Sequence, residues 1–168
     1  MRRRLILSKN RVMDLITHPS APTRGRIRFS ADEHSLGEEQ DAVPRILVVE
    51  DDYVVALELE NALSEAGFAV VGTASSAAEA VRQAMSKRPM LAVMDIRLAG
   101  KSDGVEAAIE MLHTCGVRCL FATAHHDAET QARAAKAAPL GWLPKPYQLD
   151  TLISMINAAV SELKAGRS

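Results

Sequence analysis

Long hydrophobic runs and cysteines are scarce in this 168-residue sequence. No apolar run approaches the ~20 residues that a membrane-spanning helix needs, and the basic start, MRRRLILSK, is too poor in apolar residues for a signal peptide. The two cysteines, Cys115 and Cys119, supply neither a four-ligand zinc site nor a disulfide framework. We therefore expect a cytoplasmic protein without a membrane span, in which both cysteines are small apolar residues.

A net excess of either charge is also lacking, since Lys and Arg number 20 and Asp and Glu number 21. Without an overall basic field, the composition argues against a nucleic-acid partner. The charges are unevenly spread, however: residues 1–30 carry a net charge of +7, residues 31–43 carry −5 and residues 44–168 carry −3. This distribution predicts an ordinary acidic domain from residue 44 onward, behind a segment of different character.

Residues 1–43 form that first segment, and they show no sustained hydrophobic period. Pro, Ser, Gly and Glu are frequent from residue 18 onward, a composition typical of linkers and disordered chains. We interpret residues 1–43 as a disordered N-terminal extension, basic and then acidic. A basic amphipathic anchor for an acidic surface and a true start codon further along the chain remain as alternatives.

From Pro44 the chain alternates short apolar runs with helical patterns. The expected strands are residues 45–49, 69–74, 90–94, 117–123 and 141–143, and the expected helices are residues 53–66, 76–87, 103–113, 127–137 and 149–164. Strict alternation with apolar strands is typical of a parallel sheet covered by helices on both faces. We predict an α/β fold, a doubly wound (βα)5 sheet of strand order 2-1-3-4-5, over residues 44–164, with a tail at 165–168.

Two local patterns predict how individual helices begin and pack. Ser76 and Glu79 have the spacing of a capping box at the start of the second helix. In the first helix, apolar residues recur at helical spacing and should form the buried face: Val55, Leu59, Ala62, Leu63 and Ala66.

Acidic residues directly follow two of the expected strands. Glu50, Asp51 and Asp52 come after the first strand, and Asp95 comes after the third. In a doubly wound sheet these two strand ends meet at the switch point, where ligands bind. Carboxylates at such range repel unless a proton or a cation intervenes, and converging oxygen donors favour Mg²⁺ over Zn²⁺. The sequence therefore predicts a Mg²⁺ site, with Asp52 as an acid at a helix N-terminus.

Two further polar residues follow the remaining strands. Thr123 ends the fourth strand with a hydroxyl group, and Lys145 follows the fifth with an ammonium group. A metal, a carboxylate, a hydroxyl donor and a fixed positive charge together suit phosphoryl transfer to Asp95, because aspartate is a known acceptor type. Catalysis would then consist of positioning and charge stabilisation.

Residues 45–163 resemble the receiver domain of two-component response regulators, the CheY-like family. The resemblance rests on four motifs at the ends of expected strands: ILVVEDD (46–52), VMDIRL (93–98), FATA (121–124) and LPKPY (143–147). It implies that Asp95 is the phosphoacceptor and that Glu50 and Asp51 are the acidic pair that binds Mg²⁺. The backbone carbonyl of Arg97 would be a further metal ligand.

The resemblance also implies a switch. Thr123 would be the switch hydroxyl, Trp142 the switch aromatic, and Lys145 the lysine that neutralises the phosphoryl group. The bond between Lys145 and Pro146 would be cis, as is usual in that family.

A closer resemblance is to single-domain regulators of alphaproteobacteria with the signature F-A-T-G-x-Y. The segments FAT and GWLPKPY support this similarity, although Ala124 replaces the glycine and His125 follows it. Arg97 and His125 fall at the two variable positions that tune dephosphorylation in the family.

These similarities imply a phosphoacceptor signalling protein, not an enzyme. A sensor histidine kinase or histidine phosphotransfer protein would phosphorylate Asp95. The downstream protein would bind the face formed by helix 127–137, strand 141–143 and helix 149–164. No output domain is evident in the sequence, so we expect a stand-alone regulator, phosphorelay intermediate or phosphate sink, and a homodimer is a further option.

Two alternatives belong to other classes of protein. One is a pseudo-receiver that binds partners without phosphorylation, which the intact acidic pair, Thr123 and Lys145 disfavour. The other is a haloacid-dehalogenase-type phosphohydrolase, which needs a second aspartate two residues after the first. Arg97 stands there and cannot deliver a proton at neutral pH.

Overall fold

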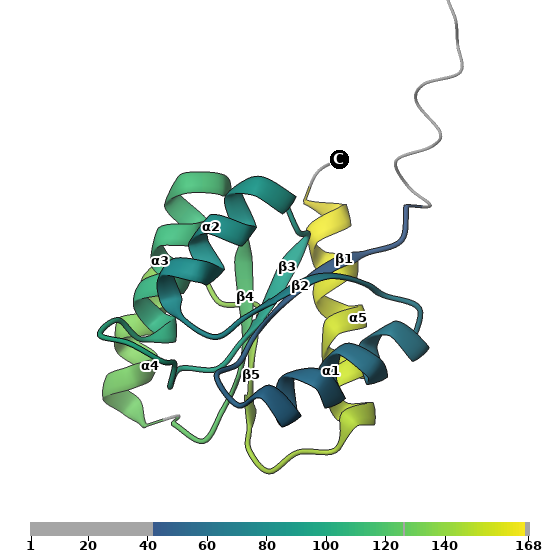
Figure 1. Ribbon diagram of the computed structural model, residues 1–168. Helices are drawn as coiled ribbons and strands as arrows, with labels where there is room; N and C mark the ends of the chain where they lie inside the picture. Colours follow the sequence, from purple (N-terminus) through teal and green to yellow (C-terminus); the bar gives the residue numbers. More distant parts are fainter. Residues whose placement is uncertain (1–41, 126, 167–168) are drawn as a thin grey trace, which may run out of the picture. The chain divides into compact units, whose positions relative to one another are not determined.

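Residues 42–125 and 127–166 are described by the structure, a computed structural model (Figure 1). The predictions for residues 1–41 therefore lie outside the described residues, as do those for residues 126, 167 and 168. The strands are β1 (Arg45–Val49), β2 (Ala69–Ala74), β3 (Leu91–Met94), β4 (Arg118–Thr123) and β5 (Gly141–Pro144). The helices are α1 (Tyr53–Glu65), α2 (Ala77–Lys87), α3 (Gly104–Cys115), α4 (Ala128–Ala134) and α5 (Leu149–Ala165), with a 3-10 turn at Ala135–Ala137.

The five strands form one parallel sheet in the order β2-β1-β3-β4-β5, which confirms the predicted fold. Because β1 lies between β2 and β3, the strand order reverses at β1, and the ends of β1 and β3 are neighbours. Their register pairs Val49 with Met94, so the residues that follow these two strands emerge side by side. In the described part, no helix is long and apolar enough to cross a membrane.

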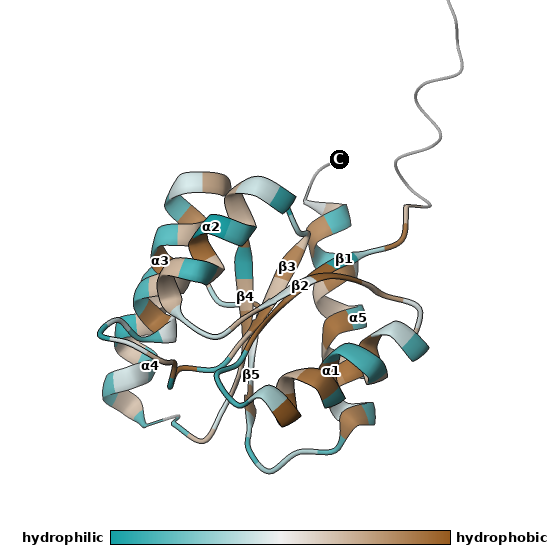
Figure 2. Cartoon of the chain, viewed as in Figure 1, coloured by the Kyte–Doolittle hydropathy of each residue, from teal (hydrophilic) through white to brown (hydrophobic). Residues whose placement is uncertain are grey.

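Helices cover both faces of the sheet. Figure 1 shows α1 and α5 on one face and α2, α3 and α4 on the other. Alternate residues of β1 serve the two cores: Leu47 and Val49 pack towards α2 and α3, whereas Ile46 and Val48 pack towards α1 and α5. All four are at most 1% exposed. The brown strands in Figure 2 reflect this burial on two sides, which is why the strand sequences are continuously apolar.

Helix α1 buries most of the face that was predicted for it. Its buried residues are Ala56, Leu59 and Leu63, while Val55 is half-buried and Ala66 lies exposed beyond the helix. Of the predicted stripe, Val55 packs against the core and Ala62 is half-buried, whereas the burial of Ala56 was not predicted. Ala56 is 6% exposed and adds a small side chain to the buried face.

The capping box at α2 is only half formed. The Ser76 hydroxyl accepts the Glu79 backbone N–H at 3.4 Å, as predicted. The Glu79 carboxylate, however, accepts the backbone N–H of Ser75 at 3.1 Å and not that of Ser76. The predicted helix 127–137 is also divided, because α4 ends at Ala134 and tightens into the 3-10 turn.

Candidate functional site

Two buried carboxylates lie at the carboxyl edge of the sheet. Glu50 directly follows β1 and is 5% exposed, and Asp95 directly follows β3 and is 8% exposed. Backbone hydrogen bonds extend the sheet by one residue at both points, from Glu50 N to Ala74 O and from Asp95 N to Val49 O, each 2.9 Å long. The sheet therefore fixes the backbone from which both carboxylates project.

Asp51 completes an acidic cluster with these two residues. Glu50, Asp51 and Asp95 each offer an oxygen, and the three oxygens lie within 4.8 Å of one another. Asp51 is exposed, so water has access to one side of the cluster. Asp52 turns away and caps α1, where its Oδ1 accepts the backbone N–H groups of Val54 and Val55 at 2.9 and 3.2 Å. Asp52 thus caps the helix as predicted, while Glu50 and Asp51 stay with Asp95 in the acidic cluster.

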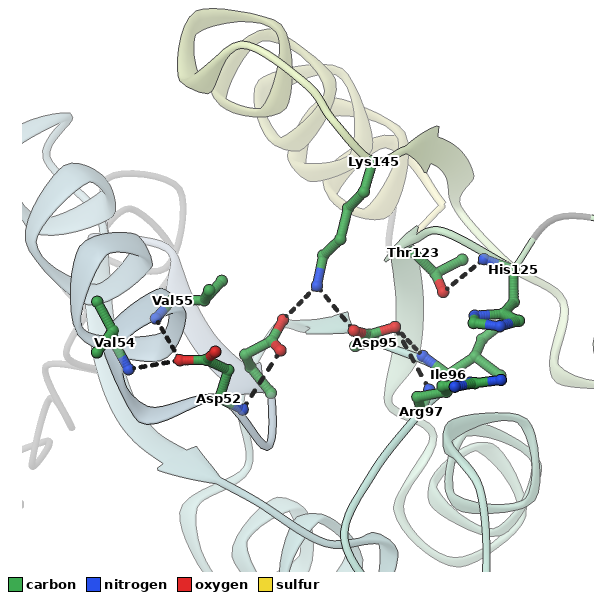
Figure 3. A network of polar contacts seen from close by, with 10 residues as sticks. Asp52, Val54, Val55, Asp95, Ile96, Arg97, Thr123, His125 and Lys145 are labelled. Carbon is green, nitrogen blue, oxygen red and sulfur yellow. Dashed lines mark hydrogen bonds and ion pairs between the residues drawn. The ribbon is translucent and has the colours of Figure 1, made fainter.

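Lys145 joins the two buried carboxylates (Figure 3). Its Nζ donates to Glu50 Oε2 at 2.6 Å and to Asp95 Oδ2 at 2.7 Å. Burial opposes the charge of the ammonium group, but its hydrogen bonds to Asp95 and Glu50 prevail and raise the pKa of Lys145. Burial also raises the pKa of the Glu50 carboxyl, against the opposing hydrogen bond from Lys145. The peptide bond between Lys145 and Pro146 is cis, as predicted.

The second oxygen of the Asp95 carboxylate is held by the backbone. Oδ1 accepts the N–H of Ile96 at 2.6 Å and that of Arg97 at 3.4 Å. Gly104, the first residue of α3, packs against the same segment and donates its N–H to Ile96 O at 2.8 Å. These contacts orient the carboxylate, since one oxygen faces the backbone and the other faces Lys145.

Thr123 and Trp142 lie on the two strands beyond β3. Thr123 ends β4, is fully buried, and accepts the backbone N–H of His125 at its Oγ1 over 3.1 Å. Trp142 pairs in register with Phe121 and stacks on it, with ring centroids 4.6 Å apart and planes 21° apart. Trp142 is half-buried and packs against the core cluster that includes residues of α3 and α4.

Sequence reasoning missed several residues around the site. Tyr53 and Val54, at the start of α1, are 77% and 71% exposed, and Leu57 is 42% exposed, so α1 presents apolar side chains to solvent next to the acidic cluster. The sequence could have indicated their exposure, because all three residues fall outside the apolar stripe predicted for this helix. Gly104 was also missed, since the need for a residue without a side chain depends on a tertiary contact.

The receiver-domain family matches this chain over residues 46–157, under the description "Response regulator receiver domain". The chain therefore belongs to that family. It is a CheY-like receiver domain, a class of domain that serves in signalling as a phosphoacceptor. Receiver domains partner with histidine kinases, and an acidic cluster such as Glu50, Asp51 and Asp95 is typical of their Mg²⁺ site.

Two curated relatives illustrate the similarity. The transcriptional regulatory protein PdtaR of Mycobacterium tuberculosis is 33% identical over 124 residues, which are 73% of this chain and 60% of PdtaR. The phyllosphere-induced regulator PhyR of Methylorubrum extorquens is 32% identical over 136 residues, which are 80% of this chain and 50% of PhyR. The chain thus spans between half and 60% of the length of these relatives.

Solved structures show the same architecture. The signal receiver domain of a modulated diguanylate cyclase from Desulfovibrio desulfuricans G20 is 38% identical, with a TM-score of 0.69, and the match covers 74% of this chain and 99% of that one. A CheY-like receiver protein from Methanospirillum hungatei gives the same TM-score at 22% identity, which supports the fold alone. The closer similarity to alphaproteobacterial single-domain regulators stays a prediction.

Proposed function

We propose that Asp95 accepts a phosphoryl group from a sensor histidine kinase, or from a histidine phosphotransfer protein, in a Mg²⁺-dependent reaction. The observation that carries the proposal is the bridge made by Lys145, whose ammonium group contacts both Glu50 and Asp95 within an acidic cluster. Two carboxylates that are buried side by side repel each other, and this repulsion costs free energy unless a cation compensates it. Such pairs are therefore more typical of functional sites than of structural ones.

The donor set fits a hard divalent cation. Three carboxylate oxygens lie close together, one carboxylate is open to water, and the described cluster contains no His or Cys. Glu50, Asp51 and Asp95 would hold Mg²⁺, and the backbone carbonyl of Arg97 is proposed as a further ligand. When bound, Mg²⁺ would supply positive charge against the carboxylates and the phosphoryl oxygens.

The protein's own groups account for the rest of the reaction. An oxygen of the Asp95 carboxylate forms a bond to phosphorus while the bond from phosphorus to the donor histidine nitrogen breaks. The electron pair of that bond stays on the imidazole, which takes a proton from solvent. Lys145, already 2.7 Å from Asp95 Oδ2, neutralises charge on the transferred group.

Thr123 provides the proposed link from the phosphoryl group to the surface. Because its Oγ1 accepts the His125 N–H, its own hydrogen is free to bond a phosphoryl oxygen. A shift of Thr123 would act on β4, on which Trp142 is stacked through Phe121. We infer that phosphorylation changes the face formed by α4, β5 and α5, which would bind the downstream protein or a second copy. That the protein signals without an output domain stays a prediction, since the chain spans only part of the length of its relatives.

Intact mass spectrometry tests this proposal. The chain is incubated with Mg²⁺ and acetyl phosphate or phosphoramidate, beside Asp95→Asn. We expect a gain of about 80 Da, lost in the variant and in EDTA, as for one acyl-linked phosphoryl group. No gain, together with no binding of beryllofluoride, would establish a pseudo-receiver instead. Turnover of an aryl phosphate would support the phosphohydrolase, which the arginine at position 97 disfavours.

A further inference from the structure

A pocket of about 580 Å³ lies at the edge of the sheet opposite the acidic cluster. It is lined by residues just before β3 and at the start of β4. Leu91 and Arg118, the first residues of these parallel strands, pair with each other, so both strands begin beside the pocket. Since Asp95 follows the other end of β3, a ligand in this pocket would leave Asp95 uncovered.

The C-terminal ends of three helices open onto this pocket. Its lining includes the residues that cap α2, α3 and α5, which are Arg88, Gly116 and Gly166. Helices α2 and α3 cover one face of the sheet and α5 covers the other, so the pocket is built from both layers (Figure 1). Carbonyl groups at helix C-termini carry partial negative charge, which disfavours a ligand of high negative charge.

Arg88 has a backbone conformation that glycine adopts more easily. Its φ of 47° and ψ of 59° lie in the left-handed region, as does the φ of 72° of Gly116, which ends α3. Glycine is the usual residue at such a helix end, because a Cβ makes the left-handed conformation unfavourable. An arginine in this strained position favours a functional role for its side chain.

One guanidinium group of the pocket is paired and the other is free. Arg118 donates from Nε to Ala138 O and from Nη1 to Glu162 Oε1, both at 2.7 Å. Glu162 is the one acidic residue in the lining, and Arg118 already compensates it. Across residues 42–125 and 127–166, the side chain of Arg88 makes no hydrogen bond or ion pair. The described lining therefore carries one uncompensated positive charge, that of Arg88.

Apolar side chains complete the lining. Pro89 and Val117 are buried, and Met90 and Leu163 are half-buried. We propose that this pocket binds a small monocarboxylate with an apolar body. The carboxylate pairs with the Arg88 guanidinium, since the two planar groups match in a two-pronged hydrogen-bonding geometry. The body lies against the apolar side chains, in a volume that is within the usual range for small-molecule sites.

Hexanoate is the probe, Arg88→Gly is the test variant and Arg82→Gln is the matched control. Arg82 is an exposed residue of α2 that does not line the pocket, and each substitution removes one positive charge. Hexanoate is titrated into each protein and followed by amide NMR shifts. We expect saturable shifts at Met90, Cys115 and Val117 in wild type and in Arg82→Gln, and an affinity about tenfold weaker in Arg88→Gly. Equal affinities of the two variants would overturn the site.

The stability of Arg88→Gly separates a binding role from a structural one. Without hexanoate we expect this variant to resist urea better than wild type, because glycine relieves the strain of the left-handed conformation. Weaker binding together with higher stability would support the site. Weaker binding together with lower stability would show that the Arg88 side chain supports the fold, and would contradict the proposal.

Two further probes test the chemistry of the ligand. Hexylamine has the same apolar chain with a positive charge, and inorganic phosphate has negative charge without an apolar body. We expect both to bind more weakly than hexanoate, since Arg88 repels the amine and the helix C-termini disfavour the phosphate dianion. Binding of either probe as tight as that of hexanoate would overturn the assignment of a carboxylate.

Cys115 supplies a readout that does not need NMR, because its half-buried thiol lines the pocket. We expect saturating hexanoate to slow the alkylation of Cys115 by iodoacetamide in wild type and in Asp95→Asn alike. Protection in Asp95→Asn would support the site whether or not the protein is phosphorylated. An unchanged alkylation rate in both proteins would contradict binding in this pocket.

Discussion

Lys145 Nζ lies 2.7 Å from Asp95 Oδ2, although the two residues are 50 positions apart in the chain. The same nitrogen lies 2.6 Å from Glu50 Oε2. One ammonium group thus compensates two carboxylates whose side chains are 5% and 10% exposed. The three carboxylates outnumber the one ammonium group, and the exposed Asp51 leaves one side of the cluster open, which suits a divalent cation.

Replacing Lys145 with Met should destabilise the fold, because it leaves two buried carboxylates facing each other. We expect a loss of about 2–4 kcal/mol in the free energy of unfolding, measured by urea denaturation without metal. Millimolar Mg²⁺ should recover part of this loss, since the cation takes over the compensation. Lys136→Met, an exposed change, should stay within about 0.5 kcal/mol. Equal stabilities of Lys145→Met and wild type would contradict the bridge.

Gly104→Ala should disturb the acidic cluster, although Gly104 is not one of its residues. A Cβ at this position would overlap with the Asp95 carbonyl oxygen and lie 3.0 Å from the Ile96 Cα, and backbone atoms cannot rotate aside. We expect an unfolding free energy about 2–4 kcal/mol lower and a weaker affinity for Mg²⁺. Gly166→Ala is the control, because the nearest atom would be 3.6 Å from its Cβ. Equal stability of Gly104→Ala and Gly166→Ala would contradict the close packing of α3 against Asp95 and Ile96.

Trp142, the one tryptophan of the chain, should report the proposed switch by its fluorescence. We expect the emission to change when Mg²⁺ and beryllofluoride are added to wild-type protein. In Thr123→Ala this change should disappear while beryllofluoride still binds, because the hydroxyl that would link the anion to β4 is gone. Phe121→Leu serves as a second variant, since it removes the ring on which Trp142 stacks. An unchanged response in Thr123→Ala would refute the link.

The two cysteines should differ in reactivity. Burial raises the pKa of the Cys119 thiol to about 12, so this thiol stays protonated and inert at pH 8. Cys115 is only half-buried. With iodoacetamide at pH 8 we expect one alkylation in the native protein and two in urea, with the native reaction absent in Cys115→Ser. Rapid native alkylation of Cys119 would show that its strand is not packed as described.

The sheet and its order were predictable because burial on both faces leaves a simple signal. Strands β1, β3 and β4 are almost unbroken apolar runs, and the sequence turns polar where each run ends, although the first polar residue is still buried. That transition marks Glu50, Asp95 and Thr123 together, so strand order alone places them at one edge. The site could be assembled from sequence because its residues stand at boundaries between strands and loops.

The details that escaped prediction depend on how the elements pack. Ala56 is buried in α1, although the spacing of the larger apolar residues does not mark it. Helix α4 ends at Ala134, and Ala134 and Ala137 are both buried beside α3, a tertiary contact that the sequence pattern does not reveal. The bridge from Lys145 to both carboxylates likewise requires side-chain geometry across three loops.

The site of phosphorylation is the most direct test of the account. Wild-type protein is treated with Mg²⁺ and acetyl phosphate, the acyl phosphate is trapped by borohydride reduction, and the peptides are sequenced by mass spectrometry. The account predicts that reduction converts residue 95, and no other, to homoserine, and that Asp95→Asn gives no such product. Reduction at Asp51, or a phosphoryl group carried by His125, would contradict it.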